Sequence, residues 1–253
     1  MKFLAALKFL TILPLFSKRE DSIEEIRGSL VYYPLVGLII GLILAALNWL
    51  FGFLFPQAVA NGLLIVSLVI ISGALHLDGF IDTCDGIAGH KPVEARWQVM
   101  HDSRTGAFGV VGAVLLILMK YVSLNSVPPG LLTPTLIMMP VLGRWAMVYA
   151  IFAYPYARPE GLGKIIKPGA TWFSFGAATV ITLVIGIGLA WIGLDVTAVV
   201  TMVGVWVIIV IVATFFKRMF AGLTGDTYGA INEIAEVSVL LIVILLAHNG
   251  WLI

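Results

Sequence analysis

Residues 31–55, VYYPLVGLIIGLILAALNWLFGFLF, form an apolar stretch without a single charged side chain. A helix of roughly 20 apolar residues is long enough to cross about 30 Å of hydrocarbon. Further stretches of this kind, or nearly as long, lie at 57–77, 107–124, 131–153, 171–192, 196–216 and 236–253. The sequence therefore predicts about seven transmembrane helices.

The composition agrees with this interpretation. Of the 253 residues, 60% are hydrophobic and only 11% are charged, which is too apolar a chain to bury inside one water-soluble domain. We therefore expect an all-α, polytopic integral membrane bundle that forms a single domain over residues 1–253. The net charge of +1 argues against a nucleic-acid partner. The spacing of Gly37 and Gly41 permits close helix contact in lipid.

The N-terminal residues 2–16 predict a separate short helix. Apolar residues at positions 3, 4, 7, 10 and 13, together with two lysines, fit an amphipathic helix that lies in the membrane surface or re-enters the membrane. Pro14 is expected to end or kink it. Lys8 interrupts the apolar run and no small-residue cleavage site follows, so we do not expect removal as a signal peptide.

The positive charges predict the orientation of the chain. Nearly all Lys and Arg residues lie in the hydrophilic segments 17–30, 78–106, 154–170 and 217–235, and none lies in the alternate connections near 56, 125–130 and 193–195. The positive-inside rule places the charged segments on the cytoplasmic face of the cell (inner) membrane. Seven spans would then leave the C-terminus outside.

The segment LHLDGFIDTCDGIAG at 75–89 carries the densest group of acids. Asp78, Asp82 and Asp85 follow i, i+4, i+7 spacing, which places them on one helix face within about 10 Å of axial rise. Oxygen ligands grouped on one face suit Mg²⁺ or Mn²⁺, and the glycines at 79, 86 and 89 leave space for close backbone approach to a ligand. The alternative is a helix end that emerges into water.

A second segment, AGLTGDTYGAINEIAE at 221–236, combines acids with glycines. Thr224 is an N-cap residue type, and Gly225 would let backbone N–H groups at a helix N-terminus face a phosphate. Asp226 and Glu233, seven residues apart, share a helix face. An ordinary interfacial helix start remains the alternative for this segment.

Cations could complete the site. Arg158 and Lys164, in the segment 154–170, could bind phosphates. Arg144 lies roughly 14 Å inside its span, where it needs a carboxylate partner such as Asp226 or Glu233, or a substrate phosphate. We interpret Lys120 as a side chain that extends to the outer membrane surface, and His76 as an interfacial histidine.

Carboxylates, phosphate-binding backbone and arginines at one membrane face indicate chemistry on a diphosphate. The residues that carry this chemistry closely resemble the cobalamin synthase family, the adenosylcobinamide-GDP ribazoletransferases. The resemblance rests on Leu75-His76-Leu77-Asp78-Gly79 with Asp82-Thr83 and Asp85-Gly86, on Asp102-Ser103-Arg104, Gly143-Arg144 and Arg158-Pro159, on Gly161-Leu162-Gly163-Lys164, and on Thr224-Gly225-Asp226 with Gly229-Ala230 and Glu233. It covers nearly the whole chain.

The resemblance implies that adenosylcobinamide-GDP and α-ribazole, or its 5′-phosphate, are joined with Mg²⁺ and with release of GMP. The ribazole 3′-hydroxyl would attack the phosphorus attached to cobinamide. The implied metal ligands are Asp78, Asp82, Asp85 and Asp226. The implied substrate-binding residues are Arg104, Arg144, Arg158, Lys164, Thr224, Gly225 and Glu233. Asp82 and Asp102 are both candidates for the catalytic base, and the sequence does not choose between them.

Two alternatives come from other classes. A CDP-alcohol phosphotransferase would share the start of its motif, Asp82-Thr83-Cys84-Asp85-Gly86, but Gly89 and His90 stand where that motif has Ala-Arg. A transporter would need charged groups near the bilayer midplane and access from both faces. We expect the lipid bilayer as the chain's surroundings, and leave open a homo-oligomer or an association with other enzymes of nucleotide-loop assembly.

Overall fold

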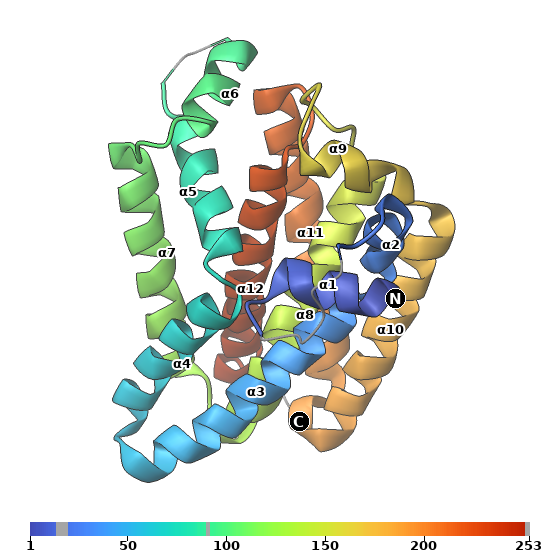
Figure 1. Ribbon diagram of the computed structural model, residues 1–253. Coiled ribbons are helices and arrows are strands. Elements are labelled where there is room, and N and C mark those ends of the chain that lie inside the picture. Colours follow the sequence, from blue (N-terminus) through green and yellow to red (C-terminus); the bar gives the residue numbers. More distant parts are fainter. Residues whose placement is uncertain (14–19, 90–91, 251–253) are drawn as a thin grey trace.

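The computed structural model describes residues 1–13, 20–89 and 92–250, and these residues form helices and no strand (Figure 1). The helices are α1 (Lys2–Leu10), α2 (Ile23–Gly28), α3 (Tyr33–Leu54), α4 (Gln57–Ile71), α5 (Leu75–Ile87), α6 (Val93–Met100), α7 (Ala107–Ser126), α8 (Pro129–Ala153), α9 (Leu162–Ile166), α10 (Trp172–Leu189), α11 (Asp195–Phe220) and α12 (Gly225–His248). The predicted all-α membrane bundle is confirmed.

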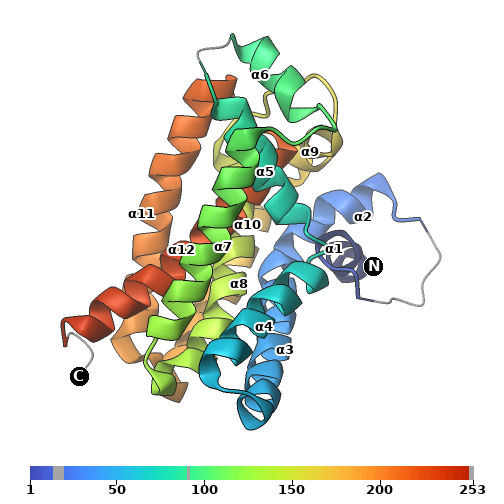
Figure 2. The same ribbon diagram turned by 90° about the vertical axis from the view of Figure 1, so that its left-hand side faces the viewer.

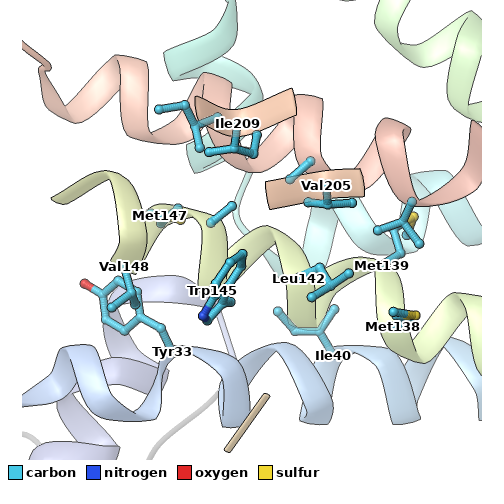
Figure 3. Close-up of a cluster of buried hydrophobic side chains, with 14 of the residues drawn as sticks. Tyr33, Ile40, Met138, Met139, Leu142, Trp145, Met147, Val148, Val205 and Ile209 are labelled. Carbon is cyan, nitrogen blue, oxygen red and sulfur yellow. The ribbon is translucent and has the colours of Figure 1, made fainter. Parts of the chain in front are cut away.

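Helix α8 is the centre of the bundle, because α3, α10, α11 and α12 all pack against it. Figure 3 shows side chains of α3, α8 and α11 meeting in one buried cluster. Lipid is itself apolar, so such helices associate through close packing of small residues. A Cβ atom on Gly37 would lie 2.5 Å from the Pro140 carbonyl oxygen, and one on Gly41 would lie 2.6 Å from the Ile137 Cα atom. The close contact predicted at these glycines is therefore confirmed.

The predicted number of seven spans is not confirmed. Among the residues that the structure describes, five helical stretches are long and apolar enough to cross a membrane, or six if α4 and α5 form one bent span. The predicted spans 171–192 and 196–216 correspond to α10 and α11, which belong to one of these stretches, Trp172–Phe220. Non-helical backbone at Ile192 and Gly193 separates them, and the two helices pack against each other.

The span predicted at 57–77 is not straight. Helix α4 ends at Ile71, and α5 leaves it at an angle of 89°. Gly73 and Ala74 both have positive φ, at 60° and 57°, so the chain cannot continue as a right-handed helix there. The break leaves carbonyl groups of α4 without helical partners. Ile12, which follows α1, donates its amide to the Ile71 carbonyl oxygen at 2.9 Å.

The predicted N-terminal helix is present as α1, which runs across the other helices and packs on α3 (Figures 1 and 2). Pro14 lies outside the described residues, as do Lys18, Arg19 and Lys91 of the positively charged segments. The last span was predicted at 236–253, whereas α12 already begins at Gly225 and residues 251–253 are not described. The hydrophilic segment 217–235 is therefore mostly helical, and Glu233 is buried inside the bundle.

Candidate functional site

The site is built on the crossing of α5 and α12, where the two backbones touch. A Cβ atom on Gly79 would lie 2.7 Å from the carbonyl oxygen of Asp226, and one on Gly229 would lie 3.1 Å from the carbonyl oxygen of His76. Only glycine fits at the closer of these contacts, at Gly79, while a side chain at Gly229 would require the neighbouring backbone to shift by a few tenths of an ångström. The space at Gly79 that the sequence assigned to a ligand is thus filled by a neighbouring helix, and this contact brings the acids of α5 to Asp226.

We call Asp78, Asp82 and Asp226, together with Arg158, the acidic site. The charges of Asp226, Asp78 and Asp85 all act on Asp82, and the Arg158 guanidinium acts on it with the opposite sign. Arg158 forms an ion pair with Asp226, with 2.9 Å between Nη2 and Oδ2. Three carboxylates therefore share one guanidinium, which leaves this site with an excess of negative charge.

Arg158 reaches Asp226 because two loops are joined. Ala157 donates its amide to the Leu223 carbonyl oxygen at 2.8 Å, and Leu223 donates to the Pro155 carbonyl oxygen at 2.9 Å. The loop after α8 is in this way attached to the short turn that precedes α12. Thr224 begins α12 as a buried N-cap whose hydroxyl accepts from the amide of Thr227. Its predicted contact with phosphate stays a prediction.

A cavity of about 270 Å³ opens beside the acidic site. Its walls include Asp78, Arg158, Gly225 and Asp226, which the sequence predicted, and His76, His101, Tyr156 and Tyr228, which it did not. His76, which the sequence analysis interpreted as an interfacial histidine, is buried and lies in the cavity wall. Its position two residues before Asp78 was the available signal, whereas nothing local in the sequence marked Tyr156 or Tyr228.

Asp85, Asp102 and Arg104 line a second, shallower hollow of about 590 Å³. The carboxylate of Asp85 accepts the amides of Gly106 at 2.7 Å and Gly109 at 2.8 Å, so it holds the N-terminus of α7. Arg104 donates to both carboxylate oxygens of Asp102, and this bidentate contact lowers the pKa of Asp102 to about 2. The Arg104 side chain is 87% exposed.

Arg144 belongs to a different group, which we call the buried charge cluster: Lys120, Arg144, Glu233 and Glu236. Lys120 contacts Glu233 at 2.6 Å and Glu236 at 2.5 Å, and Arg144 forms an ion pair with Glu236. The sequence analysis considered a carboxylate partner or a substrate phosphate for Arg144. The structure shows a carboxylate partner, but it is Glu236 and not Asp226 or Glu233. Lys120 is buried, so the interpretation that it extends to the membrane surface is wrong.

The remaining predicted residue, Lys164, is exposed, and its Nζ donates to the carbonyl oxygen of Pro159 within the same loop. Within the described part of the chain, no three His, Cys, Asp or Glu side chains come together closely enough to enclose a metal ion. The four predicted metal ligands therefore do not form one closed group. Asp78 and Asp226 face the cavity, while Asp85 faces the second hollow.

Comparison with known proteins identifies a family. Residues 2–244 match the family model described as cobalamin-5-phosphate synthase. Three similar proteins are named adenosylcobinamide-GDP ribazoletransferase. The protein from Roseiflexus sp. (strain RS-1) is 37% identical over 92% of this chain and 85% of its own length. That from Desulforamulus reducens is 36% identical over 95% and 94%, and that from Geotalea daltonii is 36% identical over 93% and 93%. No solved structure matches the chain.

Proposed function

The chain belongs to the cobalamin-5-phosphate synthase family, and from this premise we propose that it is an adenosylcobinamide-GDP ribazoletransferase. It joins adenosylcobinamide-GDP to α-ribazole, or to its 5′-phosphate, and releases GMP. The observation that carries the proposal is the acidic site beside the cavity, where an excess of carboxylates and the single guanidinium of Arg158 lie side by side. Such a site suits a diphosphate that brings a divalent cation with it.

The acidic site fits Mg²⁺. This ion keeps several waters and is usually bound by one or two carboxylates together with substrate phosphates, so an enclosing cage of ligands is not required. Asp78 and Asp226, which both line the cavity, would hold it. Bound there, Mg²⁺ would neutralise charge on the phosphoryl oxygens. Arg158 would bind the same diphosphate with its planar guanidinium.

In the transfer, the ribazole 3′-hydroxyl attacks the phosphorus attached to cobinamide, the new P–O bond forms, and the bond to GMP breaks. Of the two candidate bases, Asp82 suits the transfer of the hydroxyl proton better than Asp102. Partial burial and the neighbouring acids both disfavour the negative charge of Asp82. Asp102 is held in its ionised form by Arg104, and a carboxylate with a pKa of about 2 is a weak base.

We propose that the acidic site opens on the cytoplasmic side of the cell membrane, as the distribution of lysine and arginine indicates. Cysteines introduced at Lys164 and Lys217 should then react with an impermeant thiol reagent only from the cytoplasmic side, and one at Ser126 only from outside. Cys84 is replaced by serine beforehand, because it is the chain's own cysteine. Labelling of 164 and 217 from opposite sides would contradict a single shared site.

The function is tested with the purified protein in detergent, where no transport can be measured. Incubation with adenosylcobinamide-GDP, α-ribazole and Mg²⁺ should give the cobalamin product and GMP in equal amounts. The same reaction with EDTA should stop, and return when Mg²⁺ is added. GMP release without α-ribazole, or no product at all from folded protein, would reject the proposed transfer.

A further inference from the structure

Four residues of the cavity wall carry buried side-chain polar atoms without a hydrogen-bond partner among the described residues, namely Tyr33, His76, Arg158 and Tyr228. Both ring nitrogens of His76 and the hydroxyl of Tyr228 have no hydrogen-bond partner within the described residues. The two residues line the cavity and are 1% and 3% exposed. The great majority of buried polar side-chain atoms in proteins are hydrogen-bonded, so each exception needs an explanation. Arg158 belongs to the acidic site, while His76 and Tyr228 lie on the two helices that cross beside it, α5 and α12.

The two side chains lie deeper than the acidic site. Along α12, Asp226 is in the first turn, Tyr228 and Gly229 follow, and Glu233 and Glu236 come one and two turns later. The close contact between Gly229 and the backbone of His76 places His76 at this level on α5. Beyond it lies the buried charge cluster, because the charges of Arg144, Glu236 and Lys120 all act on His76. His76 therefore separates the cavity from that cluster.

The acidic site and the buried charge cluster, which lie on opposite sides of His76, differ in charge. This difference decides what can bind at the deep end of the cavity, where His76 and Tyr228 lie. The buried charge cluster, which lies beyond His76, holds two cations and two carboxylates, so its formal charges balance. A histidine ring and a tyrosine hydroxyl offer hydrogen bonds at the deep end. An anionic diphosphate would gain more at Arg158, near the acidic site. The deep end consequently suits an uncharged polar group.

We propose that His76 and Tyr228 form a second subsite, which binds an uncharged hydrogen-bonding group of the nucleoside substrate. Since α-ribazole is a nucleoside without a phosphate, its sugar hydroxyls or its base nitrogen are the groups that would form hydrogen bonds with His76 and Tyr228. Adenosylcobinamide-GDP would hold its diphosphate at the acidic site. The subsite rests on the proposed function for the identity of its ligand.

The test is Tyr228→Phe, which removes the hydroxyl and keeps the ring. Losing one hydrogen bond to the ligand should raise KM for α-ribazole by about 3- to 10-fold, with kcat and KM for adenosylcobinamide-GDP within about twofold. The melting temperature without substrate should stay the same or rise, because the hydroxyl has no protein partner to lose. Tyr154→Phe is the matched control. Its hydroxyl lies 3.2 Å from the Val210 carbonyl oxygen and 3.0 Å from the Thr214 hydroxyl, so it should lower the melting temperature and leave both KM values unchanged.

His76 is tested by the pair His76→Gln and His76→Leu. Glutamine keeps a hydrogen-bonding group and should retain more affinity for α-ribazole than leucine does, at similar melting temperatures. A KM for α-ribazole within twofold of wild type in both Tyr228→Phe and His76→Leu would overturn the subsite, as would a rise confined to KM for adenosylcobinamide-GDP. Failure of the proposed function is distinguishable, because the unmodified protein would then form no cobalamin product in the first place.

Discussion

The acidic site and the buried charge cluster both combine carboxylates with an arginine, but only one of them is balanced. In the buried charge cluster, two carboxylates meet two cations, and contacts of 2.5 and 2.6 Å join Lys120 to Glu236 and Glu233. In the acidic site, three carboxylates share the guanidinium of Arg158. The formal charges of the buried charge cluster balance, whereas an excess of one charge beside a cavity needs a ligand. We therefore assign a structural role to the buried charge cluster and the catalytic role to the acidic site.

The largest effect is expected in the acidic site. Asp226→Asn and Asp82→Asn should each lower kcat by about 10²- to 10⁴-fold, as removal of a metal ligand or a base does. The melting temperature of substrate-free Asp82→Asn should not fall, since the change relieves repulsion between like charges, whereas that of Asp226→Asn should fall, because this change also weakens the ion pair with Arg158. Glu94→Gln, an exposed acid on α6, is the control with unchanged turnover. Near-normal rates in both acidic-site variants at limiting Mg²⁺ would remove this assignment.

The buried charge cluster should respond in the opposite way. Glu236→Gln leaves Lys120 and Arg144 with too little negative charge in the membrane interior, and breaking a buried pair in this way typically costs about 3–5 kcal/mol of stability. The melting temperature should fall strongly. Turnover per folded molecule should stay within a few-fold of wild type, because these residues lie outside the cavity wall formed by described residues.

A paired change sharpens this prediction. Replacing Lys120 by Met and Glu233 by Gln together removes one charge of each sign and leaves the Arg144–Glu236 pair intact. The double variant should be more stable than Glu236→Gln alone. If it is equally unstable, charge balance is not what the cluster supplies.

The sequence predicts the parts of this fold that depend on local pattern. Apolar length located the spans, and the spacing of Gly37 and Gly41 predicted a close helix contact that the structure confirms. The bend between α4 and α5 escaped prediction because it depends on a positive φ at Ala74, a residue that gives no such signal. The N-cap residue type of Thr224 did indicate the helix start at Gly225, whereas apolar length alone placed the last span only from 236 onward.

In the candidate site, too, the sequence predicts only what a local pattern determines. Periodicity predicted Asp78, Asp82 and Asp85 on one face of one helix, and all three do lie on α5, but Asp78 lines the cavity while Asp85 lines the second hollow. Periodicity could not show that the Asp85 carboxylate accepts the amides of Gly106 and Gly109. Likewise, Lys120 and Glu236 are 116 residues apart in the chain, and no local pattern pairs them. Contacts between distant helices decide which charges are used for packing and which remain for a ligand.

A smaller effect is expected at the cation of the acidic site. Arg158→Lys keeps the charge but loses the planar, two-pronged contact with a phosphate. KM for adenosylcobinamide-GDP should rise by about tenfold, while KM for α-ribazole and the melting temperature change little. Arg218→Lys, at an exposed position near the end of α11, should alter neither KM value. An equal rise in both KM values would show that Arg158 acts on the cavity as a whole and not on the diphosphate.

The smallest effect is expected at Asp102, in the second hollow. Arg104 lowers the pKa of Asp102 to about 2 in the folded chain. A carboxyl whose folded pKa is depressed contributes its stability above the unfolded value, near pH 4, and loses it only as the pH falls toward 2. Between pH 5 and 9 the group stays ionised in both states, so it can supply no pH dependence there. This ion pair is also exposed, and exposed pairs contribute little to stability.

Asp102→Asn should therefore lower kcat/KM by less than about threefold and leave the shape of its pH profile between 5 and 9 unchanged. The measurement is kcat/KM for both substrates across this range, in wild type and variant. Loss of the acidic limb of the profile in Asp102→Asn would identify Asp102 as the base that titrates during turnover. The reacting hydroxyl would then lie beside the second hollow, and the charge comparison that assigns chemistry to Asp82 and its neighbours would no longer hold.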